Sequence, residues 1–236
     1  MSDCFILDGQ RIPFNTGQSL IEAAEAAGVY IPHLCYKKNY PAQGSCRLCS
    51  VKVDGRWCSA CTEPATADQI VESQTVEITA LRRRLVQLLF VEGNHYCPFC
   101  EKSGNCELQA LAYHLDMHDG HFSHQFPQRQ LDASHPEVIL DRDRCIQCEL
   151  CVRASQQQDH KNIFALSGRG PDTHLIVNSP SGQLHDSGIS ASDQAVAVCP
   201  TGALLPRAKP YATPIDHRRY DQLTIAQQSV DNEKTS

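Results

Sequence analysis

Residues 93–109 read GNHYCPFCEKSGNCELQ, and this stretch decides how the whole chain is interpreted. Cys97, Cys100 and Cys106 stand close together in it, and His95 lies just ahead of them. A further group of cysteines precedes the stretch, and another follows it. Cysteines grouped at such spacings are typical of iron–sulfur proteins. We therefore interpret the stretch as the central one of three metal sites.

The composition points to a chain that is cross-linked by metal. The 236 residues include 13 cysteines but only 6% aromatic residues, so apolar burial alone is a weak source of stability. The N-terminal residues carry no secretory signal, and no apolar run is long enough to span a bilayer. We therefore expect a cytoplasmic protein, in which grouped cysteines usually bind metal. The net charge of −6 gives no support for nucleic-acid binding.

The N-terminal part carries the signals of a small mixed domain. Two short apolar runs around an Asp-Gly pair predict a β-hairpin. Ser19 and Glu22 have the spacing of a capping box, and the apolar residues after them predict a short helix that ends at Gly28. Further strands are predicted over 50–53 and 74–78. This order of elements predicts a β-grasp domain.

The first group of cysteines falls in the loops of that domain. Its spacing is C-x10-C-x2-C-x11-C, formed by Cys35, Cys46, Cys49 and Cys61. Four thiolates suit a [2Fe–2S] cluster, although the first gap is longer than in plant-type ferredoxins. Gly44 lets backbone amides approach the bridging sulfides. Cys58 competes for the fourth position, and zinc is the alternative metal, although zinc prefers two close C-x2-C pairs.

The central stretch lies between two predicted helices, over 80–92 and about 106–116, each with leucines on one face. The three consecutive arginines of the first helix are expected to form a solvated face or a partner contact: Arg82, Arg83 and Arg84.

Three thiolates leave one iron of a [4Fe–4S] cluster without a protein ligand. His95 is the nearest candidate, and an imidazole raises the potential relative to a thiolate, as in Rieske centres. Other histidines follow in a polar stretch, where a histidine is normally a surface residue. These weaker candidates are His114, His118, His121 and His124.

The third group follows a short apolar run at 138–140 and has the C-x2-C-x2-C spacing of a [4Fe–4S] site. Its members are Cys145, Cys148 and Cys151. Two-cluster bacterial ferredoxins have a further cysteine where this chain has Ser155, so we expect a single cluster here. Cys199 is the expected fourth ligand, because Pro200 turns the chain away from the cluster.

The fold class predicted from these signals is α+β, with one [2Fe–2S] and two [4Fe–4S] clusters. The predicted domains are a β-grasp [2Fe–2S] ferredoxin-like domain at 1–79, a helical His/Cys3 [4Fe–4S] segment at 80–125, a bacterial-ferredoxin-like [4Fe–4S] domain at 126–205 and an extended tail at 206–236. Cys4 and Cys58 remain outside the clusters as structural or unpaired residues.

These motifs, in this order over residues 3–205, resemble the N-terminal iron–sulfur module of the large iron–sulfur subunit of respiratory complex I. The same module begins iron-only hydrogenases and some NAD-dependent formate dehydrogenases. The resemblance implies that Cys61 completes the [2Fe–2S] site, a histidine the middle site and Cys199 the last. The family histidine stands where this chain has Gly93. Either the loop is rearranged so that His95 reaches iron, or that iron has another ligand.

The central stretch, in a chain that ends after the third site, resembles the small diaphorase-side subunit of soluble NAD-reducing nickel–iron hydrogenases. The resemblance implies a relay without catalytic residues, within a hetero-oligomer of a flavoprotein that reduces NAD and the small and large hydrogenase subunits. Nucleic acid and membranes are not expected partners. The alternatives are the equivalent subunit of a formate dehydrogenase or split complex I, a free-standing ferredoxin-like carrier, and a zinc-stapled interaction protein. A mobile carrier rarely needs three clusters in series.

Overall fold

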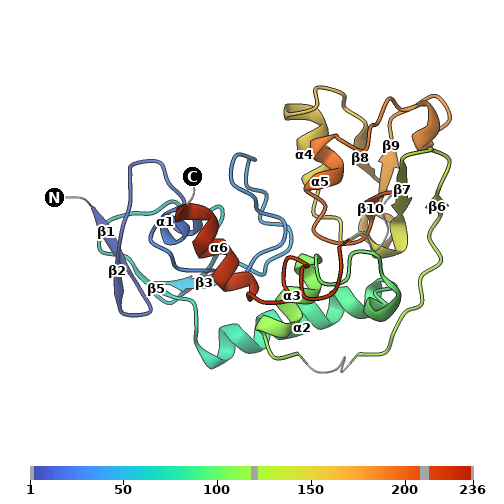
Figure 1. Ribbon diagram of the computed structural model, residues 1–236. Coiled ribbons are helices and arrows are strands. Elements are labelled where there is room, and N and C mark those ends of the chain that lie inside the picture. Colours follow the sequence, from blue (N-terminus) through green and yellow to red (C-terminus); the bar gives the residue numbers. More distant parts are fainter. Residues whose placement is uncertain (1–2, 118–121, 208–212, 235–236) are drawn as a thin grey trace. The chain divides into compact units, whose positions relative to one another are not determined.

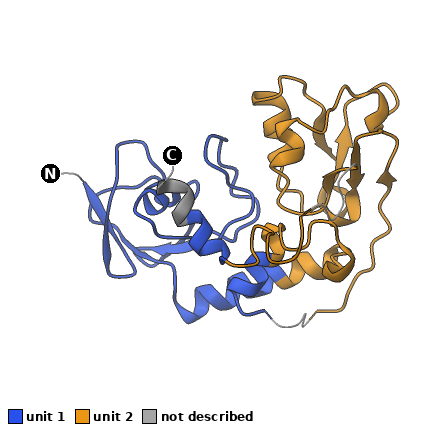
Figure 2. Cartoon of the chain, in the orientation of Figure 1, with its two compact units in different colours: residues 1–86, 110–118, 223–236 blue, residues 87–109, 119–222 orange. Residues whose placement is uncertain are grey.

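The computed structural model describes residues 3–117, 122–207 and 213–234 (Figure 1). The chain forms two compact units, coloured separately in Figure 2. Unit 1 contains residues 1–86, 110–118 and 223–236, and unit 2 contains residues 87–109 and 119–222. The predicted domain boundaries at 79/80 and 125/126 stay predictions, since the two units divide the chain differently.

Unit 1 is built on a five-stranded sheet with the order β2-β1-β5-β3-β4. Its strands are β1 (Cys4–Leu7), β2 (Gln10–Pro13), β3 (Ser50–Val53), β4 (Arg56–Ser59) and β5 (Ile70–Glu72). Strand β1 pairs antiparallel with β2 and parallel with β5, which in turn pairs antiparallel with β3. Helix α1 (Leu20–Ala26) joins this sheet in one hydrophobic core. The arrangement confirms the predicted β-grasp fold.

Helix α1 forms as its sequence predicts. The Ser19 hydroxyl accepts from the Glu22 N–H at 3.4 Å, and the Glu22 carboxylate accepts from the Ser19 N–H at 2.7 Å. This reciprocal capping box satisfies two N–H groups that the helix itself leaves without acceptors. Gly28 follows the helix with φ +74°, a conformation that favours glycine. Leu20 and Ile21 are fully buried in the core beside Phe5.

The strand predicted at 74–78 is wrong, because the chain there enters helix α2 (Val76–Glu92). The Thr75 hydroxyl accepts from the Ile78 N–H at 3.2 Å and so caps the helix. The last strand of the sheet is β5, a few residues earlier, where Val71 is paired with both Leu7 and Val53. The β-branched residues that suggested a strand lie in the first turn of a helix.

Unit 2 contains a three-stranded sheet with the order β10-β7-β6 and a separate β8–β9 hairpin. Its strands are β6 (Leu131–Asp132), β7 (Val138–Asp141), β8 (Phe164–Ser167), β9 (His174–Val177) and β10 (Leu204–Pro206). Helices α4 (Leu150–Gln157) and α5 (Gln194–Ala197) pack together, with α4 against β8 and α5 against β10 (Figure 1). Strand β7 follows the prediction at 138–140. Single 3₁₀ turns lie at η1 (Cys97–Phe99), η2 (Arg142–Arg144), η3 (Gly170–Asp172) and η4 (Leu184–Asp186).

Helix α3 (Glu107–His114) follows the central cysteines, close to the predicted range. None of the helices within the described residues is long and apolar enough to cross a lipid bilayer.

The tail differs from the extended segment predicted at 206–236. Residues 225–234 form helix α6 (Ile225–Lys234), which belongs to unit 1 and packs against α1. The Thr224 hydroxyl accepts from the Gln227 N–H at 3.3 Å, and the Gln227 side chain accepts from the Thr224 N–H at 2.9 Å. This is a second capping box, and Ile225 is 6% exposed. The end of the predicted tail is therefore a capped helix with a buried apolar residue in its first turn.

Candidate metal centres

The four cysteines predicted for the first cluster gather in unit 1. The Cys46 N–H donates to the Cys35 sulfur at 3.5 Å, and the Cys49 and Cys61 sulfurs lie 3.3 Å apart. The thiol of Cys46 donates to Cys35 and lowers its pKa to about 5, and the thiol of Cys49 likewise lowers the pKa of Cys61. In each pair one thiol thus favours ionisation of the other, and the thiolate is the form that binds iron.

Backbone amides of the loop that contains Cys46 point at these sulfurs. The N–H of Cys46 donates to the Cys35 sulfur, and the backbone of Ser45 and of Gly44 contributes to lowering the pKa of Cys35 and of Cys61, respectively. Gly44 has φ +65°, so a larger residue there is strained, and an added Cβ would also touch Thr62 at 3.4 Å. The loop conformation thus depends on Gly44, in keeping with the prediction that amides serve the sulfurs of this site.

Cys58 stands apart from the four gathered cysteines. It lies on β4 opposite Val51, and its thiol is 3.6 Å from the Arg56 carbonyl oxygen. Burial, and then the charge of Glu63, raise the pKa of Cys58, whereas Cys61 interacts with the sulfurs of the group. The geometry therefore favours Cys61 as the fourth ligand.

Cys4 has a separate environment on β1. Its sulfur accepts from Nη2 of Arg11 at 2.6 Å, across the β1–β2 hairpin. The prediction that Cys4 is a structural or unpaired residue outside the clusters stays a prediction.

The three central cysteines gather in unit 2 around the turn η1. The Cys97 N–H donates to the His95 carbonyl at 3.1 Å, and the Cys100 N–H donates to the Cys97 carbonyl at 3.2 Å. Burial, followed by the charge of Cys100, raises the pKa of Cys97. Burial raises the pKa of Cys106 to about 12, and the other two thiols add to that rise. Buried neighbouring thiols of this kind ionise when metal supplies positive charge.

The imidazole of His95 fits the missing fourth ligand. Its Nε2 is buried and has no hydrogen-bond partner among the described residues. Burial, and then the charge of Arg144, lower the pKa of His95 to about 4, so the ring is neutral near pH 7. The ring packs against Phe90 with the centroids 5.5 Å apart. A neutral imidazole is the form of histidine that binds metal.

The changed histidine spacing has an explanation at Gly93. A Cβ added to Gly93 would lie 2.5 Å from Nε2 of His95 and 2.8 Å from the Asp143 carbonyl oxygen. The His95 ring therefore fills the space into which a side chain at position 93 would project. This is the position of the family histidine, so the geometry favours the rearranged loop in which His95 takes its place.

The other histidines have different surroundings. His114 belongs to unit 1, where its ring meets Tyr30 edge-on with centroids 5.3 Å apart. His124 packs against Phe126 at 4.3 Å, and its Nδ1 accepts from the Phe126 N–H at 2.9 Å. His118 and His121 lie outside the described residues.

The four cysteines predicted for the last cluster line one cavity of about 20 Å³ in unit 2. They are Cys145, Cys148, Cys151 and Cys199. Burial raises the pKa of Cys145 to about 11 and also raises that of Cys151. The Leu204 N–H donates to the Cys199 sulfur at 3.5 Å. Four thiols that line one cavity are the donor set of a cluster, and the irons of a cluster supply the missing positive charge.

Ser155, which stands where two-cluster ferredoxins have a cysteine, has a structural role. Its side chain is fully buried, and its hydroxyl accepts from the Ile163 N–H at 2.8 Å.

Within the described residues, no three His, Cys, Asp or Glu side chains converge on one point as the ligands of a single ion would. The protein ligands of an iron–sulfur cluster are divided among two or four irons, so they lie around the cluster and do not meet at one point.

Comparison with known proteins follows the same three sites. Residues 4–76 match a 2Fe-2S iron-sulfur cluster binding domain, residues 82–121 match the NADH-ubiquinone oxidoreductase-G iron-sulfur binding region, and residues 138–205 match a 4Fe-4S single cluster domain. The chain is 38% identical to the NAD-reducing hydrogenase HoxS subunit gamma of Cupriavidus necator, over 99% of both chains. The chain belongs to the gamma subunits of NAD-reducing hydrogenases.

A solved structure of NAD+-reducing [NiFe]-hydrogenase in the H2-reduced state contains a chain similar to this gamma subunit, with TM-score 0.94, 46% identity and 99% of each chain covered. The gamma subunit is also 30% identical, over 87% of its length, to the NADH-ubiquinone oxidoreductase 78 kDa subunit of Candida albicans, of which it spans 28%. The predicted relation to complex I and the predicted 2Fe–2S and 4Fe–4S cofactors are thereby confirmed, and the zinc alternative is not supported.

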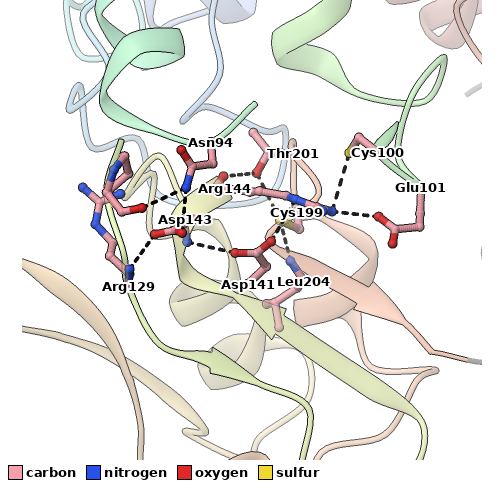
Figure 3. A network of polar contacts seen from close by, with 11 residues as sticks. Asn94, Cys100, Glu101, Arg129, Asp141, Asp143, Arg144, Cys199, Thr201 and Leu204 are labelled. Carbon is pink, nitrogen blue, oxygen red and sulfur yellow. Dashed lines mark hydrogen bonds and ion pairs between the residues drawn. The ribbon is translucent and has the colours of Figure 1, made fainter. Parts of the chain in front are cut away.

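The structure of the gamma subunit reveals a polar network between the two [4Fe–4S] sites that sequence reasoning missed. Figure 3 shows Arg144 at its centre, with Cys100 and Glu101 on one side and Asp141 near its Nε. Thr201, two residues after Cys199, donates to the Arg144 carbonyl at 2.8 Å. Asp141 lies three residues before Arg144, but Cys100, Glu101 and Thr201 come from distant parts of the chain, so no local pattern marks the whole network.

Arg82 is the second residue whose role was missed, and the predicted solvated face is wrong for it. Arg82 is 3% exposed and donates from Nε to the Leu48 carbonyl at 2.8 Å and from Nη2 to the Ser50 carbonyl at 2.9 Å. Its Nη1 donates to the Ser73 carbonyl at 2.6 Å. Arg82 therefore holds the backbone on both sides of Cys49. Arg84, two residues later, is exposed as predicted.

Proposed function

We propose that this gamma subunit relays electrons between the hydrogenase and NAD-reducing modules of its enzyme. In the reaction H2 + NAD+ → NADH + H+, H2 gives up two electrons and two protons, and NAD+ takes both electrons and one proton. Both catalytic sites would lie in partner subunits. The observation that carries the proposal is the gathering of three separate thiol groups in a chain that matches a gamma subunit over 99% of its length.

The proposed ligands follow the three gathered groups. They are Cys35, Cys46, Cys49 and Cys61 for [2Fe–2S]; His95, Cys97, Cys100 and Cys106 for the middle [4Fe–4S]; and Cys145, Cys148, Cys151 and Cys199 for the last [4Fe–4S]. When bound, such clusters supply one-electron carriers whose potentials depend on ligand type, hydrogen bonds and burial.

The residues of the chain tune these sites in different ways. The loop at Gly44 directs amide N–H groups at sulfur, which favours the reduced, more negative state. His95 contributes a neutral donor where the other ligands are anionic, which raises the potential of the middle site. The burial of Cys151 and its neighbours excludes water from the last site.

The proposed partners are a flavoprotein that reduces NAD and the small and large subunits of a nickel–iron hydrogenase, joined in a cytoplasmic hetero-oligomer. The second candidate is the equivalent subunit of an NAD-dependent formate dehydrogenase or split complex I. The 30% identity to the 78 kDa subunit over 87% of the chain supports this second candidate.

The first test is composition. The native complex, purified anoxically through this subunit, is assayed for nickel, molybdenum, tungsten, flavin and iron. Nickel together with flavin, and about ten irons from this chain, supports the proposal. Molybdenum or tungsten without nickel moves the chain to a formate dehydrogenase. Neither metal, with the chain alone, contradicts the relay.

A matched pair of variants tests the first ligand set. Cys61→Ser should remove or alter the [2Fe–2S] signal in electron paramagnetic resonance (EPR) spectra, whereas Cys58→Ser should leave it unchanged. The reverse result would assign the fourth position to Cys58.

A further inference from the structure

We propose that Arg144 is a positioning residue that joins the two [4Fe–4S] sites and raises the reduction potential of the middle one. The proposal rests on the proposed ligation of the middle cluster by Cys100. Arg144 is not itself a cluster ligand. The proposal goes beyond the relay function because it says what sets the reduction potential of the middle cluster.

The side chain of Arg144 is fixed against the middle site. Its Nη1 lies 3.7 Å from the Cys100 sulfur and 2.7 Å from Oε2 of Glu101, the residue next to Cys100. Its Nε lies 2.9 Å from Oδ2 of Asp141. The guanidinium is partly buried, with 21% of the side chain exposed. The carboxylates of Glu101 and Asp141 bind different nitrogens of the guanidinium and hold it in one orientation. A lysine ammonium does not reproduce this geometry.

The backbone of Arg144 is fixed to the last site. Arg144 directly precedes Cys145, and its carbonyl accepts from the Thr201 hydroxyl at 2.8 Å. The same hydroxyl lies 3.9 Å from the Cys199 sulfur. One residue thus reaches a proposed ligand of the middle site with its side chain and the loop of the last site with its carbonyl (Figure 3).

Gly202 packs against Cys100 and Arg144, at the junction between the middle and the last site. A Cβ added to Gly202 would lie 2.9 Å from the Cys100 sulfur and 3.4 Å from Cδ and Nη1 of Arg144. The backbone that follows Cys199 therefore packs directly on a proposed ligand of the other cluster. The junction leaves no room for a side chain between the two sites.

Charged side chains beside Cys100 change the reduction potential of the middle cluster. A cation beside a ligand sulfur stabilises the reduced state, so it raises the potential, and a carboxylate at the same place lowers it. Arg144 and Glu101 form one ion pair but carry opposite charges. Removing either breaks the same contact, whereas the electrostatic effects on the cluster have opposite signs.

The test is an EPR-monitored redox titration of the intact complex. Arg144→Gln should lower the midpoint potential of the middle cluster, with at least a tenfold fall in its equilibrium constant for reduction, or about 59 mV for one electron. Glu101→Gln should raise the midpoint above wild type. Arg144→Lys, which keeps the charge, should recover at least half of the Gln shift. Shifts of the same sign in the two Gln variants, or no shift in either, would overturn the proposal.

Two further outcomes are separable. If Arg144→Gln loses the middle cluster, the Glu101→Gln variant still decides, because a midpoint at or below wild type there overturns the proposal. Cys100→Ser tests the ligand assignment alone: an unchanged middle-cluster signal would remove the basis in the proposed function, whatever the Arg144 variants show.

Discussion

Replacing Arg82 by leucine removes a buried cation from α2 and leaves three backbone carbonyls of unit 1 without their donors. These carbonyls belong to Leu48, Ser50 and Ser73, and the Ser73 hydroxyl loses a donor as well. Hydrogen bonds to a charged group contribute roughly 1.5–3 kcal/mol each. The four together therefore contribute about 6 kcal/mol at the low end of that range.

The burial of the charge offsets part of this contribution. Burial lowers the pKa of Arg82 to about 10, against an ordinary value near 12.5. That difference corresponds to a cost of about 3 kcal/mol, which the leucine variant no longer carries. The expected net destabilisation is thus at least about 3 kcal/mol. For a chain of this length, that lowers the unfolding midpoint by roughly 6–12 °C.

The assay is thermal unfolding of the holoprotein, followed by far-UV circular dichroism and by the visible signal of the [2Fe–2S] cluster. Scan rate is held constant because cluster loss makes unfolding irreversible. Arg84→Leu, on an exposed position of the same helix, is the matched control and should melt like wild type. Because Arg82 holds both residues that flank Cys49, the cluster signal should be lost together with the fold. An Arg82→Leu midpoint equal to that of Arg84→Leu would show that the buried hydrogen bonds of Arg82 do not stabilise unit 1.

Three further results are expected. His95→Cys should retain the middle cluster at a lower midpoint potential, because a thiolate is anionic and imidazole is neutral; an unchanged potential in an EPR titration would point to another ligand. Gly202→Ala should cost about 1–3 kcal/mol through overpacking and change the g-values of the middle cluster, and identical spectra would show that Cys100 is not in contact with that loop. Removing iron with a chelator should leave the chain largely unfolded by circular dichroism, and cooperative melting of the apo-protein would contradict this.

The features that the sequence predicts well are local ones. Cysteine spacing is set within a few residues, so the C-x2-C pairs and their loops could be recognised directly. The capping box at Ser19 and Glu22 is also local, and it forms as expected. The hairpin predicted around the Asp-Gly pair pairs Phe5 with Ile12.

The features that were missed depend on distant parts of the chain. Thr75 is a helix cap whose following residues alternate like a strand, so local pattern alone favoured the wrong element. In the sequence, Arg82 cannot be told apart from the two arginines that follow it. Its role depends on the Leu48 carbonyl, which only the fold brings close. Arg144 and Gly202 acquire their roles only when Cys100 of the central stretch, distant from both in the sequence, packs against them.

The most direct test of the relay compares whole and partial reactions of one complex that carries Cys106→Ala in this subunit. Assembly is checked first by co-purification of all subunits. H2-dependent reduction of an artificial dye by the hydrogenase module and NADH-dependent dye reduction by the flavin module should both persist, while H2-driven reduction of NAD+ should be lost. Retention of H2-driven NAD+ reduction in a complex without the middle cluster would show that electrons do not pass through this subunit's middle site.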